Sequence, residues 1–239
     1  MITSAHSLIE VRHLSKRYGR VVALNDVSFD VRAGEVLGLI GPNGAGKTTL
    51  FECMAGVLPY DRGSVRLADA SPVDASAPPP MFYIPDSIAP WPAQPLQWAL
   101  EFSAGFLARS GDDRMEEVVA ALDLRPLLGT RIAALSKGQR KRALLAIGLM
   151  TPAPVLLVDE PFDGLDLRQA RTVAALLRQY ADSGRTLFLS IHQISDAARV
   201  CDRFVLIGGG RICGTGTLEE LAATSGAPAD LEEVFLALT

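Results

Sequence analysis

The sequence has few cysteines and no long uninterrupted run of apolar residues. Its three cysteines, Cys53, Cys201 and Cys213, are odd in number and lack the spacing of metal ligands. We therefore expect buried thiols in a reducing compartment rather than a disulfide framework. The longest apolar candidate, residues 143–150, is far shorter than the roughly 20 residues that a membrane-spanning helix needs. The first residues have no basic segment and no apolar core, so we expect no signal peptide.

Positive charge is not in excess either. The 239 residues include 23 lysines and arginines against 27 aspartates and glutamates, which gives a net charge of −4. This balance argues against a general affinity for nucleic acids or anionic membranes. Hydrophobic residues make up 49% of the chain and charged residues 21%, which predicts a globular protein with one large domain, or a domain with a subdomain.

The most informative stretch is residues 41–49, which fits the phosphate-binding pattern G-x-x-x-x-G-K-[ST]. An apolar run at 35–40 predicts a buried strand before it, and residues 48–55 predict a helix that Gly56 ends. A strand, a glycine-rich turn and a helix N-terminus together direct backbone N–H groups toward an anion. The members of the loop are Gly41, Pro42, Asn43, Gly44, Ala45, Gly46, Lys47, Thr48 and Thr49.

Three side chains of this loop have expected roles toward ATP. We expect Lys47 to meet the β- and γ-phosphates, Thr48 to place its hydroxyl on Mg²⁺, and Thr49 to contact the α-phosphate. A chance glycine-rich turn would be the structural alternative. The complete motif in its strand–helix context favours nucleotide binding.

Two carboxylates follow a second buried strand. Residues 155–158 are apolar, and Asp159 and Glu160 come directly after them, at the end of the strand where α/β sheets bind ligands. We expect Asp159 to hold Mg²⁺ and Glu160 to act as the general base toward a water molecule. His192, after a predicted strand at 186–190, is expected to sense the γ-phosphate. Two acids that only cap the following turn would be the structural alternative.

The first quarter of the chain is rich in predicted strands. Residues 8–14 and 27–31 alternate apolar and polar side chains, as antiparallel strands do, and residues 16–20 predict a polar turn between them. After Pro152 and Pro154 the pattern returns to alternating strands and helices. The sequence therefore predicts the α/β class.

The middle of the chain has helical periodicity. Residues 96–109 and 136–150 each predict a helix, and a third helix is predicted to begin at Asp112 or Asp113. We expect a single domain over residues 1–239. Its core would be formed by residues 1–84 and 155–239, and residues 85–154 would form an inserted helical subdomain.

Local capping signals predict where the last helices begin. Ser195 is expected to cap a short helix that ends at Arg199. Thr217 and Glu220 have the spacing of a capping box, and Asp230 precedes the final helix.

The order and spacing of these motifs resemble the nucleotide-binding domain of ATP-binding cassette (ABC) proteins. The distinguishing element is the sequence Leu-Ser-Lys-Gly-Gln-Arg at 135–140, which is similar to the family signature LSGGQ. Its predicted helix N-terminus would attract an anion. In the family, this element reaches the γ-phosphate of an ATP that the other subunit holds. The signature residues here are Ser136, Lys137, Gly138 and Gln139.

The resemblance covers nearly the whole chain and assigns further residues. Tyr18 stands where the family stacks an aromatic ring on adenine. Residues 162–166 resemble the D-loop, with Asp166 as its acidic residue, and His192 matches the switch histidine. Five motifs in the right order make the resemblance specific.

The chain departs from the family pattern at two positions. Lys137 replaces a common glycine of the signature. Asp86 follows the apolar strand at 81–84, where the family usually has the Q-loop glutamine, and we expect its carboxylate to face Mg²⁺ or its water. Gln94 and Gln97 would take this role only with a shift of register.

The resemblance implies a P-loop NTPase core with an N-terminal antiparallel β subdomain and an inserted helical subdomain that carries the signature. It implies an ATPase with ATP and Mg²⁺ as cofactors. A second cassette, as homodimer or heterodimer, and a separate integral membrane permease are the implied partners, and no nucleic acid is expected. The chain would be cytoplasmic, peripheral on the cytoplasmic face of the membrane. Lys137, Asp86 and the tail at 231–235 favour an exporter.

Two other functions compete with this interpretation. A soluble ABC ATPase that acts on ribosomes or DNA usually has two cassettes in one chain or a long coiled-coil insertion, and this sequence has neither. An interaction module that binds nucleotide without turnover would not need the Asp159–Glu160 pair together with His192.

Two surface features have more than one explanation. The basic cluster Lys137, Arg140, Lys141 and Arg142 is expected to be a solvated face rather than a nucleic-acid site, because the overall charge is negative. Trp91 and Trp98 lie in a proline-rich stretch. They would either anchor a helix of the membrane subunit or pack locally, and the sequence does not distinguish the two.

Overall fold

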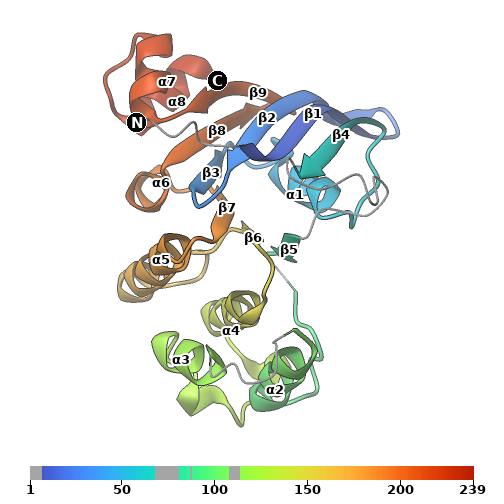
Figure 1. The fold of residues 1–239 in the computed structure, drawn as a ribbon, viewed down its shortest axis with the longest axis vertical. Coiled ribbons are helices and arrows are strands. Elements are labelled where there is room, and N and C mark those ends of the chain that lie inside the picture. The colour runs from blue at the N-terminus through green and yellow to red at the C-terminus, as the bar shows by residue number, and fades with distance from the viewer. Residues whose placement is uncertain (1–6, 68–80, 87, 108–113) are drawn as a thin grey trace.

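Two β-sheets form the upper part of the molecule as Figure 1 shows it, and helices extend below them. The computed structural model describes residues 7–67, 81–86, 88–107 and 114–239. The smaller sheet is antiparallel with the order β2-β1-β4. Its strands are β1 (Ser7–Tyr18), β2 (Val21–Arg32) and β4 (Arg62–Leu67).

The main sheet has the order β5-β6-β7-β3-β8-β9, and only its last strand runs antiparallel to its neighbour. All residues of β3 and β6 are buried, because helices or the other sheet cover both faces. The strands are β3 (Val36–Ile40), β5 (Met81–Ile84), β6 (Val155–Asp159), β7 (Thr186–Ile191), β8 (Arg203–Gly208) and β9 (Arg211–Gly216).

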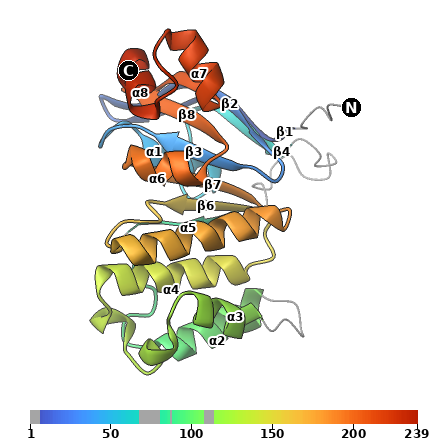
Figure 2. The same cartoon turned by 90° about the vertical axis from the view of Figure 1, so that its left-hand side faces the viewer.

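Helices pack on the main sheet and form a separate layer below it. Figure 2 shows α5 between the sheet and α4, with α2 and α3 beneath α4. The helices are α1 (Lys47–Met54), α2 (Leu96–Leu107), α3 (Arg114–Ala121), α4 (Lys137–Met150), α5 (Leu167–Asp182), α6 (Ile194–Val200), α7 (Leu218–Ser225) and α8 (Leu231–Leu238). Short 3-10 turns lie at η2 (Arg125–Leu127) and η3 (Ile132–Ala134).

Each face of the main sheet has its own hydrophobic cluster. Alternate residues of β3 point to opposite faces: Val36 and Ile40 belong to the cluster shared with α4 and α5, whereas Leu37 and Leu39 belong to the cluster under the antiparallel sheet. This arrangement confirms the predicted α/β class, with an N-terminal antiparallel sheet and helices inserted between β5 and β6. The exact bounds 84/85 and 154/155 stay a prediction.

Local predictions near the helix ends had mixed outcomes. The capping box predicted at Thr217 is present, Asp230 caps α8 as predicted, and the helix predicted to begin at Ser136 does so, with Ser136 as its N-cap. The cap predicted at Ser195 is wrong: α6 begins after Gln193, whose side chain makes no capping bond. The predicted residues Arg109, Asp112 and Asp113 lie outside the described residues.

The polar turn predicted at 16–20 is also wrong in its first half. Lys16, Arg17 and Tyr18 continue β1, where they pair with Leu24, Val22 and Val21 of β2. The strand continues because cross-strand pairing satisfies the backbone of these residues, and the turn is limited to Gly19 and Arg20.

Among the described residues, no helix combines the length and the apolar character needed to cross a bilayer.

Candidate nucleotide-binding site

The glycines of the phosphate loop are required by close backbone contacts. A methyl group on Gly41 would overlap the carbonyl oxygen of Ile207. Gly46 has a φ of 104°, and a methyl group there would lie 2.5 Å from the carbonyl oxygen of Ala23. The loop is thus held against β2 and β8, and α1 starts at Lys47 with its free N–H groups at the loop.

Lys47 lies inside the loop that it is predicted to serve. Its side chain is 7% exposed, and Nζ donates to the carbonyl oxygens of Gly41 at 2.7 Å and Pro42 at 3.3 Å. Oε1 of Glu160 lies 3.9 Å from the same nitrogen. The ammonium is therefore placed between the phosphate loop and the predicted general base.

Thr48 and Asp159, both predicted to hold Mg²⁺, are in direct contact. The Thr48 hydroxyl donates to Oδ2 of Asp159 at 2.8 Å, and the Ser190 hydroxyl donates to Oδ1. Hydroxyl and carboxylate oxygens suit Mg²⁺, which takes few protein ligands and completes its shell with water and phosphate oxygens. No group of three or more His, Cys, Asp or Glu side chains in the described part of the chain forms a metal site. The residues fit Mg²⁺ bound together with a nucleotide.

Glu160 is held in an unusual backbone conformation. Its φ is 51°, which is rare for glutamate and typical of constrained residues at functional sites. Its N–H donates to both the carbonyl and the hydroxyl oxygen of Ser190, each at 3.1 Å. Oε2 lies 2.5 Å from Nδ1 of His192, so the structure brings the predicted base and the predicted switch histidine into direct contact.

The basic cluster is a solvated face only in part, because Lys137 is exposed whereas Lys141 and Arg142 are buried. The side chain of Lys141 is 1% exposed, and Nζ contacts Oδ1 of Asp86 at 2.8 Å and the carbonyl oxygen of Asp159 at 2.9 Å. Arg142 is also buried and donates to the carbonyl oxygen of Leu122 at 2.6 Å. These cations face inward because carboxylate and carbonyl oxygens offset the cost of burying them.

Lys141 therefore bridges Asp86 and Asp159, because its ammonium contacts the carboxylate of the first and the carbonyl oxygen of the second. The Asp86 carboxylate forms an ion pair with Lys141, so its negative charge is already matched by a cation of the signature helix α4. Its role as a magnesium residue stays a prediction.

Sequence reasoning missed three residues near this site. Ser190 holds both Asp159 and Glu160, and Lys141 joins Asp86 to β6. Burial, together with the charge of Asp159, raises the pKa of the Tyr83 phenol, which therefore stays neutral beside the carboxylates. A polar residue at the end of the strand before His192 was the available signal for Ser190.

The signature residues contact the D-loop of the same chain. Ser136 caps α4 in a capping box with Gln139, and a methyl group on Gly138 would overlap the carbonyl oxygen of Gly164. Asp166 caps α5 by accepting a hydrogen bond from the backbone of Gln169 at 2.8 Å. Among the described residues, no hydrogen bond or ion pair joins the signature to the phosphate loop.

Tyr18 ends β1 with 47% of its surface exposed. The Lys16 ammonium lies over one face of the Tyr18 ring, 5.5 Å from the ring centre. An exposed ring is available to stack on a base, and this role stays a prediction.

The family profile for ABC transporters matches residues 24–163. The chain belongs to the ABC transporter family. The hemin import ATP-binding protein HmuV of Thermobifida fusca is 33% identical over 92% of this chain and 80% of its own length. The SkfA peptide export ATP-binding protein SkfE of Bacillus subtilis is 31% identical over 86% and 87%. A solved ATP-binding subunit of an ABC transporter has a TM-score of 0.85 and 28% identity, and covers 97% of this chain and 99% of that one.

Membership of this family makes the chain an ATP-binding subunit of an ABC transporter and an ATPase. It confirms the resemblance of the motifs and the P-loop NTPase fold. The assignment of each residue to a step of binding or hydrolysis rests on the geometry above.

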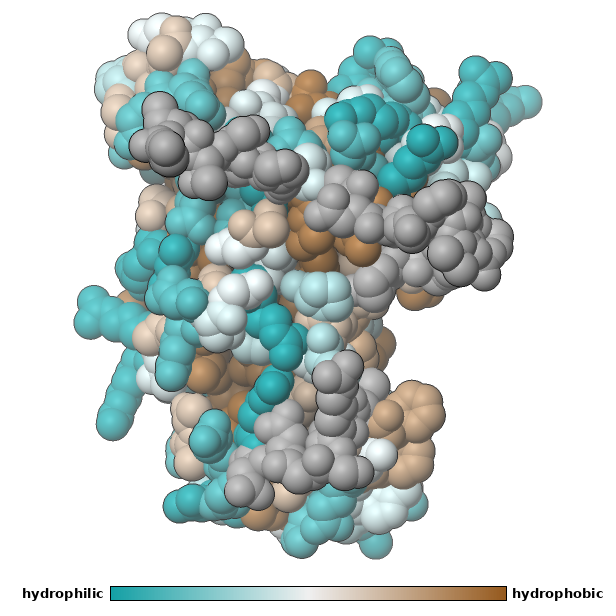
Figure 3. All heavy atoms as spheres, viewed as in Figure 1, coloured by the Kyte–Doolittle hydropathy of each residue, from teal (hydrophilic) through white to brown (hydrophobic). Residues whose placement is uncertain are grey.

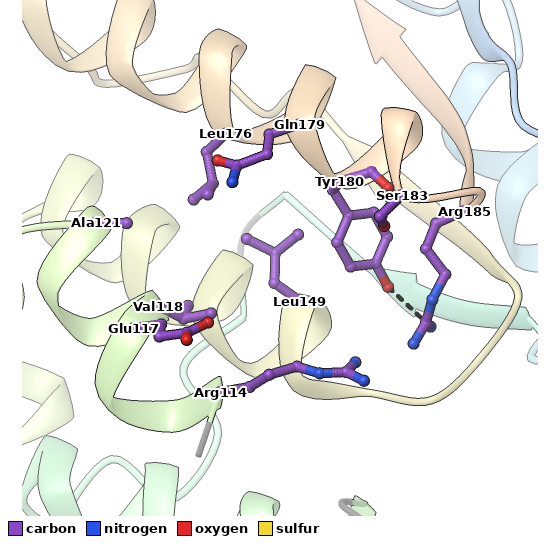
Figure 4. Close-up of a pocket in the computed structure, with 10 residues that line it drawn as sticks. All are labelled: Arg114, Glu117, Val118, Ala121, Leu149, Leu176, Gln179, Tyr180, Ser183 and Arg185. Carbon is purple, nitrogen blue, oxygen red and sulfur yellow. Dashed lines mark hydrogen bonds between the residues drawn. The ribbon is translucent and has the colours of Figure 1, made fainter. Parts of the chain in front are cut away.

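The ABC cassette has a further pocket that contains none of the predicted nucleotide residues. It has a volume of about 760 Å³ and lies between α3, α4 and α5 (Figure 4). Arg185 reaches into it but donates to Tyr180 and to the carbonyl oxygens of Thr151 and Ala153, which anchors the end of α4. The lining residues are Arg114, Glu117, Val118, Ala121, Leu149, Leu176, Gln179, Tyr180, Ser183 and Arg185.

Proposed function

We propose that this chain is one of two ATPase subunits that hold two ATP molecules between them and drive a separate membrane-spanning exporter subunit. The observation that carries this proposal is the placement of Glu160 between His192 and Lys47, at the end of the strand that presents Asp159 to Thr48. Such a cluster is suited to hydrolysis of a bound nucleotide rather than to binding alone.

Nucleotide binding begins at the phosphate loop. The N–H groups at the start of α1 receive the phosphates, and Lys47 exchanges the carbonyl oxygens of Gly41 and Pro42 for phosphate oxygens. Tyr18 stacks on the adenine. The hydroxyl of Thr48 and the carboxylates of Asp159 and Asp86 would hold Mg²⁺ and its water, which would supply positive charge to offset the negative charge of the phosphates.

Hydrolysis then depends on Glu160. Its Oε2 is oriented by His192, and its backbone is fixed by Ser190, so the carboxylate is held in place to accept a proton from the attacking water. His192 has 43% of its side chain exposed, so in this proposal it is accessible to the γ-phosphate. The pair thereby links the presence of the γ-phosphate to the position of the base.

The second cassette completes each site in this proposal. Ser136, with the amide of Gly138, stands at the N-terminus of a 14-residue helix, where the helix dipole favours an anion. This end binds the γ-phosphate of the ATP that the partner holds. Closure with ATP and opening after hydrolysis would move the membrane subunit, with the chain peripheral on the cytoplasmic face.

An exposed aromatic patch on α2 and the loop before it is our candidate surface for the membrane subunit. The rings of Trp98 and Phe102 stack with centroids 5.1 Å apart, and Trp91 meets both edge-on. Trp91, Trp98 and Phe102 are 38–48% exposed and Phe106 is 81% exposed. Figure 3 shows moderately hydrophobic residues (tan) along the lower right edge of the molecule, on the side where α2 lies in Figure 1. These rings pack against one another and still leave surface exposed for a partner. Exposed aromatic residues often anchor interfaces.

The exporter assignment rests on Lys137, Asp86 and the sequence 231–235 at the start of α8. The relatives named above include an import protein and an export protein, so similarity alone is compatible with both directions of transport.

Replacement of the base tests the proposed chemistry. Glu160→Gln is expected to bind ATP but to lower the turnover number by about 10²–10⁴-fold, because a general base contributes about that much. Phosphate release and ATP binding would both be measured. Glu219→Gln, on the exposed face of α7, is the matched control and should hydrolyse ATP normally. Near-normal turnover in Glu160→Gln would refute the role of this residue.

Capture of partners tests the proposed assembly. Tagged Glu160→Gln would be expressed in its own cell, held closed with ATP and gently solubilised. We expect a polytopic membrane protein to co-purify, and less of it when Trp98 and Phe106 are replaced by serine. Ribosomal or DNA-repair partners without a membrane protein would contradict the transporter assignment.

A further inference from the structure

Lys137 forms an ion pair with the D-loop of its own chain. It is the first residue of α4, and its Nζ donates to the carboxylate of Asp163. The hydrogen bond to Asp163 raises the pKa of Lys137, and the charges of Asp86 and Glu160 act in the same direction. The ammonium is thus charged and paired with an acidic side chain of its own subunit.

This ion pair is not what holds the two loops together. Gly138 and Gly164 are already in backbone contact, with no room for a methyl group on Gly138. The side chains of Lys137 and Asp163 are 56% and 30% exposed, and an ion pair at the surface contributes little to stability. Both charges are therefore available to change partners without disturbing the fold.

The turn that carries Asp163 begins at the predicted base. The Asp163 N–H donates to the carbonyl oxygen of Glu160 at 3.2 Å. Lys137 consequently connects the signature, which faces the partner's nucleotide in the proposed dimer, to a turn that starts at the residue predicted to hydrolyse the chain's own nucleotide.

We infer that Lys137 exchanges partners during the ATP cycle, from Asp163 in the separated subunit to the γ-phosphate of the ATP held by the other subunit. The inference rests on the proposed two-subunit sandwich. A γ-phosphate offers the lysine more negative charge than one carboxylate does, whereas ADP offers no γ-phosphate. Asp163 therefore competes with ATP for Lys137 and raises the ATP concentration needed for closure. When the other site contains ATP, Asp163 loses its ion pair with Lys137, and this change reaches the turn that starts at Glu160.

A static ion pair would behave differently from a competing one. If Lys137 and Asp163 stay paired in the dimer, removal of either charge should affect closure in the same direction. If they compete, Asp163→Asn should favour closure and Lys137→Met should oppose it, and the double variant should behave like Lys137→Met because Asp163 acts only through the lysine.

The test measures ATP-dependent dimerisation of variants in the Glu160→Gln background. Analytical ultracentrifugation gives the fraction of dimer at each ATP concentration. Asp163→Asn is expected to lower the ATP concentration for half-maximal dimer by about two- to fivefold. Lys137→Met is expected to raise it by about tenfold or more, as loss of a hydrogen bond between charged groups does. Arg125→Met removes an exposed ion pair with Glu116 and is the control for unspecific charge effects.

The outcomes separate the inference from the proposal beneath it. Shifts of equal direction in Lys137→Met and Asp163→Asn, or no shift beyond that of Arg125→Met, would overturn the exchange while leaving the sandwich intact. Absence of any ATP-dependent dimer of Glu160→Gln, under conditions where it binds ATP, would refute the sandwich itself and the exchange with it.

Discussion

Lys141 shows how a single residue connects three parts of the molecule. Its ammonium is held by Oδ1 and the carbonyl oxygen of Asp86, after β5, and by the carbonyl oxygen of Asp159, at the end of β6. It belongs to α4, whose first turn carries the signature residues. One buried cation therefore joins the signature helix to the strand ends of the candidate nucleotide site.

The energetic weight of this ion pair can be measured with one variant of each partner. Asp86→Asn is expected to lower the free energy of unfolding by about 3–5 kcal/mol, because it leaves the charge of Lys141 buried without its carboxylate. The double variant Asp86→Asn/Lys141→Met should lose less than the sum of the single changes. Urea denaturation gives both values.

Arg125→Met is the matched control for an ion pair at the surface. Its pair with Glu116 has both side chains more than 60% exposed and should be worth at most about 1 kcal/mol. A cost for Asp86→Asn no larger than that of Arg125→Met would contradict the structural role of Lys141.

At the scale of the element, α4, α5 and α7 each begin with a capping box, and α4 and α7 differ in what they face. Ser136 at α4 and Thr217 at α7 each accept a hydrogen bond from the N–H three residues later, at 3.2 Å, and Gln139 and Glu220 return one. α4 carries the signature, whereas α7 lies beside α8 at the opposite end of the molecule (Figure 1).

A comparison of Ser136 and Thr217 distinguishes the effect of a lost helix cap from a loss of function. Ser136→Ala and Thr217→Ala are each expected to lower the free energy of unfolding by about 1 kcal/mol, the usual cost of a lost N-cap. Only Ser136→Ala should also lower ATP hydrolysis, because only that cap is predicted to face a phosphate. Thermal unfolding and phosphate release, measured below the melting temperature, check this. Equal activities in the two variants would remove Ser136 from the proposed site.

At the scale of the whole molecule, two cysteines can be used as probes of the two hydrophobic clusters, because each lies in or against a different one. Cys53 is buried in the cluster under the antiparallel sheet, and Cys201 packs against the cluster on the other face of the main sheet. Burial raises the pKa of the Cys53 thiol to about 11, and burial also raises the pKa of Cys201. A raised pKa favours the neutral thiol, so the reactive thiolate is scarce in the folded protein and increases with pH.

Thiol labelling tests whether these clusters unfold together. At pH 8 only about one Cys53 thiol in a thousand should be ionised, so iodoacetamide should modify the half-buried Cys213 first. In rising urea, Cys53 and Cys201 should become reactive at the same midpoint if the domain unfolds in one step. Mass spectrometry of the labelled peptides measures each site. Labelling of native Cys53 as fast as Cys213, or two separate midpoints, would contradict this picture.

Much of the site was determined by features close together in the sequence. The phosphate loop, the Asp159–Glu160 pair and the capping boxes depend on residues a few positions apart, because glycine conformation, helix N–H groups and cap geometry are local properties. Strands β3 and β6 were predictable from their continuous apolar runs for the same reason. The interpretation of residues 16–20 failed where pairing with a second strand decided the outcome.

The partners of the charged side chains were decided only by the tertiary structure. Lys141 meets Asp86 across 55 positions of sequence, His192 meets Glu160 across 32, and Lys137 meets Asp163 across 26. A lysine has the same local sequence pattern whether it is solvated or buried. Its state depends on which distant carboxylate the packing of the sheet and helices places opposite it, because only a matched charge offsets the loss of hydration.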